Sequence, residues 1–274
     1  MLACGDRQLD LSRPVVMGIL NVTPDSFSDG ARYPSVMAAV DAGLAMQAAG
    51  AALVDVGGES TRPGAAPVAP DAEIARVLPV VESLARRGIL VSVDTSSPEL
   101  MRLAAGAGAG MINDIRGFRR PGALEALSGS KLAGCVMHAL AEPQDMQLNP
   151  TYSNVVTEIK VFLEQRLQAC RAVGIDANRL VVDPGFGFGK TVAHNLELLR
   201  GLPQIAALGA PVLVGLSRKS LLGVLTGRLL PERMAGSLAL AMLAIGRGAR
   251  IVRAHDVAET VDVLRVVEQV ENAH

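Results

Sequence analysis

The sequence predicts an α/β fold, a (β/α)8 TIM barrel that forms a single domain over residues 1–274. Two observations carry this prediction. Short apolar runs alternate with amphipathic helical stretches about eight times along the chain, which is the pattern of a (β/α)8 barrel. No Pro-, Ser- or Gly-rich linker divides the chain, and its length is ordinary for one large α/β domain.

The predicted strands are too short for helices and almost wholly apolar, as expected of parallel strands that are buried on both faces. They cover residues 15–22, 52–58, 89–94, 110–115, 132–138, 179–185, 211–217 and 249–256. An open, doubly wound sheet is the main alternative, and the count of eight strands favours the barrel.

The predicted helices lie between these strands and are rich in alanine. Gly88 directly follows the second one and suits the position that ends a helix. The helices cover residues 34–50, 71–88, 151–174, 195–207, 231–246 and 256–270.

The composition argues against two classes of partner. The net charge is −1 and the basic residues form no tail or stripe, so we expect no nucleic-acid partner. The longest clean apolar run has eight residues, from Leu238 to Ile245, whereas a bilayer span needs about 20. We therefore expect a soluble protein with no membrane partner.

The cysteines predict a reducing compartment. Cys4, Cys135 and Cys170 are odd in number, and no two share the spacing of a metal or redox site, which fits a cytoplasmic protein. Leu-Ala-Cys near the start faintly resembles a lipoprotein cleavage site. No apolar segment precedes it, so we expect no such processing.

Polar residues gather at the carboxyl ends of the predicted strands. In a barrel these ends meet at one rim, where active sites of this fold are built. The residues at these ends are Asn21, Asp94, Asn113, Asp114, His138, Asp183, Ser217, Arg253, His255 and Asp256, and Asp55 lies within the second predicted strand.

Helix capping is the simpler explanation for some of these residues, and Asp256 or Ser217 fits it. Capping does not explain why every strand ends in polar residues while the strand interiors stay apolar. Asp94, Asn113 and Asp183 fall at the interior mouth of the predicted barrel, where burial without partners is costly. These three residues therefore indicate a bound polar ligand.

Phenylalanines add a second signal. Four of the five, Phe27, Phe118, Phe186 and Phe188, follow predicted strands, and only Phe162 lies in a helix. These loops could simply pack on themselves, but we expect at least one ring to stack on a planar ligand.

The segment PGFGFGKT, residues 184–191, resembles a phosphate-binding P-loop only at its end. The first glycine of that motif is replaced by Pro184, so we interpret the glycines as permitting a tight turn and close backbone approach.

The predicted rim combines anion-binding and heterocycle-binding groups. The last strand of a closed barrel lies beside the first, so Arg253 and His255 should lie near Asn21, and Arg62 can join them. Such a set suits a diphosphate with its Mg²⁺. The acceptors deeper in the mouth suit a heterocycle rich in N–H donors, and Lys219 can reach a carbonyl oxygen or ring nitrogen of it.

Seven segments resemble the signature blocks of the dihydropteroate synthase family, in the family's order and over about residues 15–267. They are NVTPDSFSDG, DVGGESTRPG, SVDT, INDI, DPGFGFGK, GLSRKS and RAHDV. The family is a (β/α)8 barrel of the folate pathway, usually a homodimer, and the target of sulfonamides. The resemblance implies condensation of a dihydropterin hydroxymethyl diphosphate with 4-aminobenzoate, through loss of diphosphate before the arylamine attacks.

The resemblance also implies a role for each matching residue. Asn21 would bind Mg²⁺, and Ser220 would meet the aminobenzoate carboxylate at a helix N-terminus. Phe27, Asp29 and Pro63 would belong to mobile loops that close over the second substrate. The diphosphate would be held by Thr61, Arg62, Arg253 and His255. The pterin would be bound by Asp94, Asn113, Asp183 and Lys219, in a pocket lined by Met137, Phe188 and Gly215. The residues implied in catalysis are Asn21, Asp29, Arg62, Asp94, Lys219, Arg253 and His255.

Two departures from the family pattern are Ala31 in place of a glycine and the segment MHALA at residues 137–141. Neither touches the expected chemistry.

Three other functions remain to be weighed. A pterin-dependent methyltransferase would share the barrel but would not need the opening loop, the SRKS block, or Arg253 with His255. A paralogue that binds pterin without turnover is opposed by the intact loops. An aldolase would need a lysine inside a strand, and the predicted strands contain none.

Overall fold

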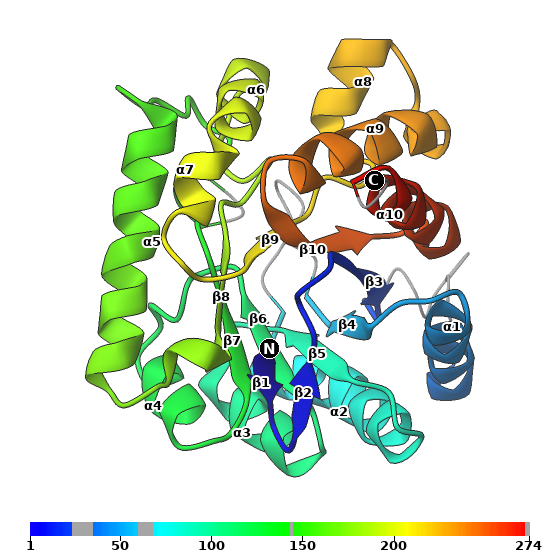
Figure 1. Cartoon of the computed structure of the whole chain (residues 1–274). Coiled ribbons are helices and arrows are strands. Elements are labelled where there is room, and N and C mark those ends of the chain that lie inside the picture. Colours follow the sequence, from blue (N-terminus) through cyan, green and yellow to red (C-terminus); the bar gives the residue numbers. More distant parts are fainter. Residues whose placement is uncertain (24–34, 60–67, 143–144, 272–274) are drawn as a thin grey trace.

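Eight parallel strands close into a barrel within the described part of the chain, in the order β10-β3-β4-β5-β6-β7-β8-β9 (Figure 1). The structure is a computed structural model and describes residues 1–23, 35–59, 68–142 and 145–271. The strands are β3 (Val15–Asn21), β4 (Leu53–Gly57), β5 (Val91–Asp94), β6 (Met111–Asp114), β7 (Ala133–Met137), β8 (Leu180–Asp183), β9 (Val212–Val214) and β10 (Ala249–Ala254). Each predicted strand is present, and the closed barrel rather than an open sheet is confirmed.

Helices surround the barrel (Figure 1). Gly88 has the positive φ expected of the residue that ends α2. Among the described residues, no helix is long and apolar enough to span a membrane. The helices are α1 (Val36–Ala48), α2 (Pro70–Arg86), α3 (Pro98–Gly106), α4 (Ala123–Ser128), α5 (Val155–Ala172), α6 (Val192–Arg200), α7 (Leu202–Ala206), α8 (Ser220–Thr226), α9 (Met234–Ile245) and α10 (Val257–Glu271).

The prediction of one helix over residues 195–207 was wrong. Helix α6 ends at Arg200 and α7 begins at Leu202, with Gly201 between them. Pro203 has no N–H to continue the α6 hydrogen bonds, but it is tolerated in the first turn of a new helix.

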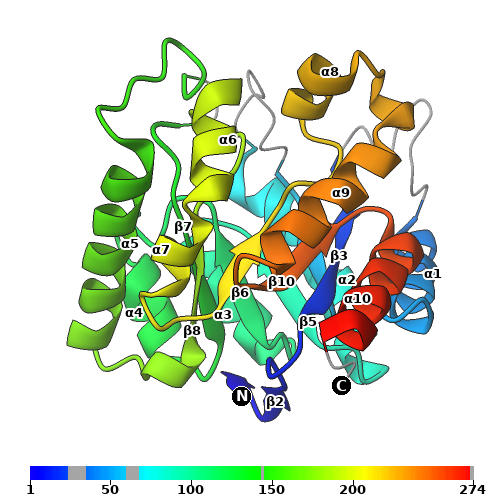
Figure 2. The ribbon, with the colours of Figure 1, turned by 45° about the horizontal axis from the view of Figure 1, so that its top comes forward.

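An N-terminal hairpin closes the end of the barrel opposite the carboxyl ends of its strands. Strands β1 (Leu2–Cys4) and β2 (Arg7–Leu9) pair antiparallel, and Figure 2 shows them below the barrel. The side chains of Leu2 and Leu9 pack in one buried cluster with inward-facing residues of the strands, such as Met17 and Leu213. One end of the barrel interior is therefore apolar and covered by the hairpin.

Strand alternation separates two sets of side chains. On β5, Val91 and Val93 face the helices and belong to the main hydrophobic cluster, while Ser92 and Asp94 face the barrel interior. Successive inward positions change from apolar to polar toward the carboxyl end, as from Leu53 to Asp55 on β4. This gradient places the polar groups at one mouth.

Candidate active site

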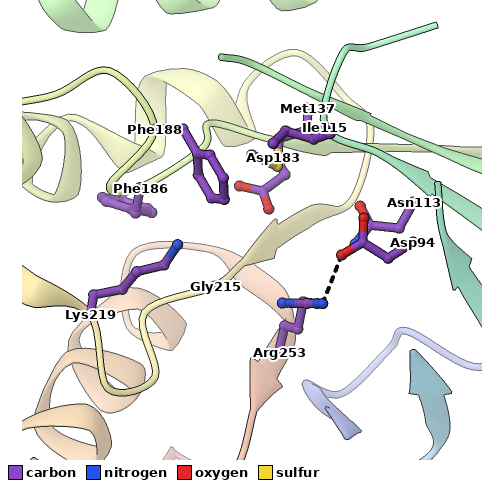
Figure 3. Close-up of a pocket in the computed structure, with 10 residues that line it drawn as sticks. All are labelled: Asp94, Asn113, Ile115, Met137, Asp183, Phe186, Phe188, Gly215, Lys219 and Arg253. Carbon is purple, nitrogen blue, oxygen red and sulfur yellow. Dashed lines mark hydrogen bonds and ion pairs between the residues drawn. The ribbon is translucent and has the colours of Figure 1, made fainter. Parts of the chain in front are cut away.

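One pocket lies at the carboxyl ends of the strands, and it gathers residues from six of the βα units (Figure 3). It is lined by Asp94, Asn113, Ile115, Met137, Asp183, Phe186, Phe188, Gly215, Lys219 and Arg253. Eight of these ten were predicted from the sequence as site residues. Residues far apart in the chain thus converge because barrel closure brings the strand ends together.

Two carboxylates face the pocket from opposite strands. Asp94 ends β5 and Asp183 ends β8, and Asp183 accepts a hydrogen bond from the backbone N–H of Gly185 at 2.7 Å. Burial raises the pKa of Asp94 to about 7 and that of Asp183 to about 6. Near pH 7 the carboxylates can therefore accept hydrogen bonds from a buried donor.

Two cations balance these carboxylates. Arg253 on β10 donates from Nε to Asp55 at 2.6 Å and from a terminal nitrogen to Asp94 at 2.9 Å. Lys219 lies after β9, and its Nζ is 4.0 Å from the centre of the Phe188 ring. Burial lowers the pKa of Lys219 to about 8. The pocket thus holds paired charges next to a flat aromatic wall (Figure 3).

Asp55 is a further site residue that was not assigned a role from the sequence. It is fully buried on β4, below the pocket, and its Oδ2 accepts from both Arg253 and Asn113, the latter at 3.1 Å. The sequence contained a signal for this role, because a carboxylate buried in the middle of an apolar strand needs a hydrogen-bonding or ionic partner. Asp55 fixes the guanidinium of Arg253 and the amide of Asn113, so it orients two pocket groups at once.

The bond to Asp55 also orients Asn113. Because its Nδ2 donates to Asp55, its Oδ1 is left as the acceptor, and within the described residues Oδ1 is buried without a hydrogen-bond partner. A buried acceptor without a partner costs free energy. Asn113 therefore suits a ligand that brings an N–H donor.

The aromatic residues divide between the site and the core. Phe188 and Phe186 line the pocket. The predicted stacking on a planar ligand requires at least one phenylalanine ring in such a position. Phe118 instead packs in the main hydrophobic cluster and is 1% exposed. Sequence reasoning did not assign Ile115 or Phe186 to the pocket, although both follow strand ends.

Several other predicted residues lie around the rim, outside the set that lines the pocket. Asn21 ends β3 and is partly buried, and Ser220 begins α8 and is exposed. His255 follows β10. Its Nδ1 lies 3.1 Å from the hydroxyl of Ser217, which lies in the loop after β9. The predicted positions Phe27, Asp29, Thr61, Arg62 and Pro63 lie outside the described residues.

Three polar residues at strand ends serve the architecture. Asp114 faces away from the pocket and accepts from the backbone N–H groups of Arg116 and Phe118, which shapes the turn after β6. Asp256 forms an ion pair with Arg218 across the β9 and β10 loops. His138 is buried, and burial with nearby cations lowers its pKa to about 2, so its ring is neutral.

The donor set can be tested against a divalent cation. Among the described residues, no group of three or more His, Cys, Asp or Glu side chains could hold a metal ion. Mg²⁺ is commonly bound by one or two protein oxygens together with substrate phosphates, and Asn21 supplies an amide oxygen at the rim. The residues present therefore fit a Mg²⁺ that is bound jointly with a phosphorylated substrate.

The chain matches a family model described as "Pterin binding enzyme" over residues 17–255. A dihydropteroate synthase of Escherichia coli strain K12 is 50% identical over 261 residues, which cover 95% of this chain and 93% of the relative.

Solved structures agree. The dihydropteroate synthase of Xanthomonas albilineans with 4-aminobenzoic acid superimposes with a TM-score of 0.93 at 49% identity, over 100% of both chains. The dihydropteroate synthase of Burkholderia cenocepacia complexed with 7,8-dihydropteroate superimposes with a TM-score of 0.91 at 48% identity, over 99% of this chain and 96% of that chain. The chain therefore belongs to the pterin-binding enzyme family and, within it, to the dihydropteroate synthases.

Proposed function

We propose that the chain condenses (7,8-dihydropterin-6-yl)methyl diphosphate with 4-aminobenzoate to give 7,8-dihydropteroate and diphosphate. The observation that carries this proposal is the pocket itself. Asp94, Asn113 and Asp183 present acceptors to the N–H edge of a pterin, next to the flat ring of Phe188. The relatives with 4-aminobenzoic acid and with 7,8-dihydropteroate support the same pair of substrates.

The proposed reaction is a dissociative substitution. The bond between the pterin methylene carbon and the diphosphate oxygen breaks, and its electron pair leaves with the diphosphate. The arylamine nitrogen then forms the new C–N bond and releases one proton. The carboxylates of Asp94 and Asp183 would stabilise the pterin cation by charge, and the apolar wall of Met137 and Phe188 would keep water from it.

The diphosphate is proposed to leave toward the rim. Arg253 and His255 would hold it, together with Thr61 and Arg62 from the part of the chain outside the described residues. A Mg²⁺ held at Asn21 would neutralise part of the negative charge that develops on the leaving oxygen. Lys219 would donate to the pterin, since its ammonium points into the pocket (Figure 3).

The arylamine is proposed to bind above the pterin. Its carboxylate would meet Ser220 at the start of α8, and Gly215 leaves room for the pterin ring beside β9. Phe27, Asp29 and Pro63 would close over it. These roles follow the family motif.

A homodimer is proposed as the functional unit, and the surface formed by α8, α9 and the segment between them supports it. Large apolar side chains there are 39% to 73% exposed, more than expected of a surface that faces only water. They are Val224, Leu225, Leu229, Leu230, Met234, Met242 and Leu243. Sedimentation of the variant Leu229→Asp as a monomer, against a wild-type dimer, would support this interface. The three buried free cysteines support a reducing, cytoplasmic setting.

The proposed reaction is tested by incubating the purified protein with the pterin diphosphate, 4-aminobenzoate and Mg²⁺. We expect diphosphate and dihydropteroate to form in equal amounts. Methyl transfer without condensation would overturn the proposal, and binding of the pterin without product would identify a paralogue that lacks turnover.

A further inference from the structure

Lys190 is a buried lysine that the reaction described above does not use. It follows the loop after β8, and its side chain is enclosed, with the residue 4% exposed. Within the described residues, no carboxylate oxygen lies within 4.0 Å of its Nζ. Burying an ammonium without a contacting counter-ion is costly, so the position demands an explanation.

The amine of Lys190 is held by three acceptors. Nζ donates to the carbonyl oxygen of Gly185 at 2.7 Å and to that of Phe188 at 3.0 Å, and it lies 3.1 Å from Nδ1 of His138. The pKa of His138 is lowered to about 2 by burial and by Lys190, so the ring is neutral and its Nδ1 can accept. Lys190 therefore joins the loop after β8 to the end of β7.

The two carbonyl groups mark the ends of one turn. The N–H of Phe188 also donates to the oxygen of Gly185, at 3.1 Å, so Lys190 and the turn share an acceptor. Gly185, Gly187 and Gly189 all have positive φ, between 66° and 80°. A segment with this many left-handed glycines has many alternative conformations, and it needs outside contacts to adopt one.

The turn carries a pocket wall. Phe188 lines the pocket, and its ring lies against the ammonium of Lys219 (Figure 3). The position of that ring therefore depends on the backbone that Lys190 holds at both ends. The middle of the turn is held by helix α6, where the side chain of Asn195 accepts a hydrogen bond from the N–H of Gly187 at 2.7 Å.

We propose that Lys190 is a positioning residue that fixes the turn of residues 185–188, so that the ring of Phe188 is pre-placed to stack on the pterin. The inference rests on the proposed function. Its physical basis is preorganisation, since a ring held in place before binding loses no conformational entropy when the ligand arrives.

The test is a double-mutant cycle on ligand affinity. Calorimetry measures binding of 6-hydroxymethyl-7,8-dihydropterin, the substrate without its diphosphate, to the wild type, Lys190→Met, Phe188→Ala and the double variant. We expect Lys190→Met to weaken binding about tenfold. In the Phe188→Ala background the same change should have less than about a twofold effect, because the ring through which Lys190 acts is gone.

Two further measurements separate positioning from general damage to the fold. The KM for 4-aminobenzoate, at saturating pterin diphosphate, should stay within about twofold of the wild type in Lys190→Met. The matched control is Lys131→Met, which removes an exposed lysine that forms an ion pair with the exposed Asp6 and should change neither constant.

A second variant applies if Lys190→Met does not fold. His138→Leu removes one acceptor and leaves both carbonyl bonds to Lys190 in place, and we expect about threefold weaker pterin binding. His138→Gln offers a replacement oxygen and should restore most of this loss. His138→Leu then replaces Lys190→Met in the cycle with Phe188→Ala.

The outcomes are distinct. A wild-type protein that binds no pterin refutes the proposed function. A wild type that binds, with multiplicative effects of Lys190→Met and Phe188→Ala, refutes the positioning role alone. A folded Lys190→Met variant with wild-type affinity for the pterin also refutes the positioning role. The same affinity in His138→Leu refutes it if that variant replaces Lys190→Met.

Discussion

Replacing Asp183 by asparagine is expected to stabilise the ligand-free fold while it weakens pterin binding. The carboxylate is 4% exposed at the end of β8. Asparagine has nearly the same shape, and its amide oxygen can still accept the hydrogen bond from the N–H of Gly185. The substitution therefore removes a buried charge and keeps the local hydrogen bond. It also removes the attraction of that charge to Lys219 and Lys190, which reduces the gain in stability.

The pKa of Asp183 sets the size of the effect. Burial raises this pKa from 3.8 to about 6. Below pH 3.8 the group is protonated in both the folded and the unfolded chain, and its charge has no effect on stability. Above pH 6 it is ionised in both, and the folded state carries the full cost. A difference of 6 − 3.8, at about 1.4 kcal/mol per pKa unit, gives an upper bound of about 3 kcal/mol at pH 7, falling to about 1.5 kcal/mol at pH 5.

Urea unfolding of both proteins between pH 4 and pH 7 measures this difference, with ligand absent. The control is Asp41→Asn, an exposed position on α1 where we expect a change below about 0.5 kcal/mol. Pterin affinity should fall at least thirtyfold, roughly 2 kcal/mol, because the amide cannot replace a charged acceptor. A variant less stable than the wild type at pH 7, with unchanged pterin affinity, would refute the reasoning.

Three other predictions concern the same site. Arg253→Ala leaves the buried carboxylates of Asp55 and Asp94 without their cation and should lower the free energy of unfolding by about 3–5 kcal/mol in a urea titration. In the same titration Arg13→Ala, which removes an exposed arginine from its ion pair with Glu268, should cost less than about 1 kcal/mol. The pH profile of kcat/KM should rise between about pH 6 and 7, as the carboxylates of Asp94 and Asp183 ionise, and fall near pH 8, as Lys219 loses its proton. In Lys219→Arg the fall should move to higher pH. A fall that stays near pH 8 in this variant would contradict the assignment to Lys219. Removing Mg²⁺ with EDTA should lower the rate of condensation at least tenfold, about 1.4 kcal/mol in activation free energy. The affinity for 6-hydroxymethyl-7,8-dihydropterin should stay within about twofold, because the metal is proposed to act on the diphosphate.

The sequence alone predicted the barrel and its functional rim for one physical reason. Parallel strands that are buried on both faces must be apolar throughout, so Val91 to Val93 or Leu180 to Val182 stand out from the helices around them. A polar residue at the end of such a strand, like Asp94 or Asp183, needs a partner and is a candidate for a site. Both signals are local. The closed barrel is confirmed, and Asp94 and Asp183 line the pocket, while their roles in binding and catalysis stay predictions.

The N-terminal hairpin and the short helices were not predicted. Strands β1 and β2 have three residues each, too few for a periodic pattern. They are stabilised by tertiary contacts, such as that of Leu2 with the barrel interior, which no local pattern reveals.

The sequence therefore determined the strands and which of their ends carry polar residues, because burial affects the composition of each segment separately. Only the tertiary structure decided which groups pair. Arg253 was expected to serve a diphosphate at the rim, and in the structure its guanidinium binds Asp55, 198 positions earlier, and Asp94. Lys190 ends the glycine-rich segment of residues 184–190, and only the structure brings its Nζ to the carbonyl oxygens of Gly185 and Phe188 and to Nδ1 of His138, which follows β7. Such pairings depend on barrel closure, which places side chains by three-dimensional distance and leaves no trace in local composition.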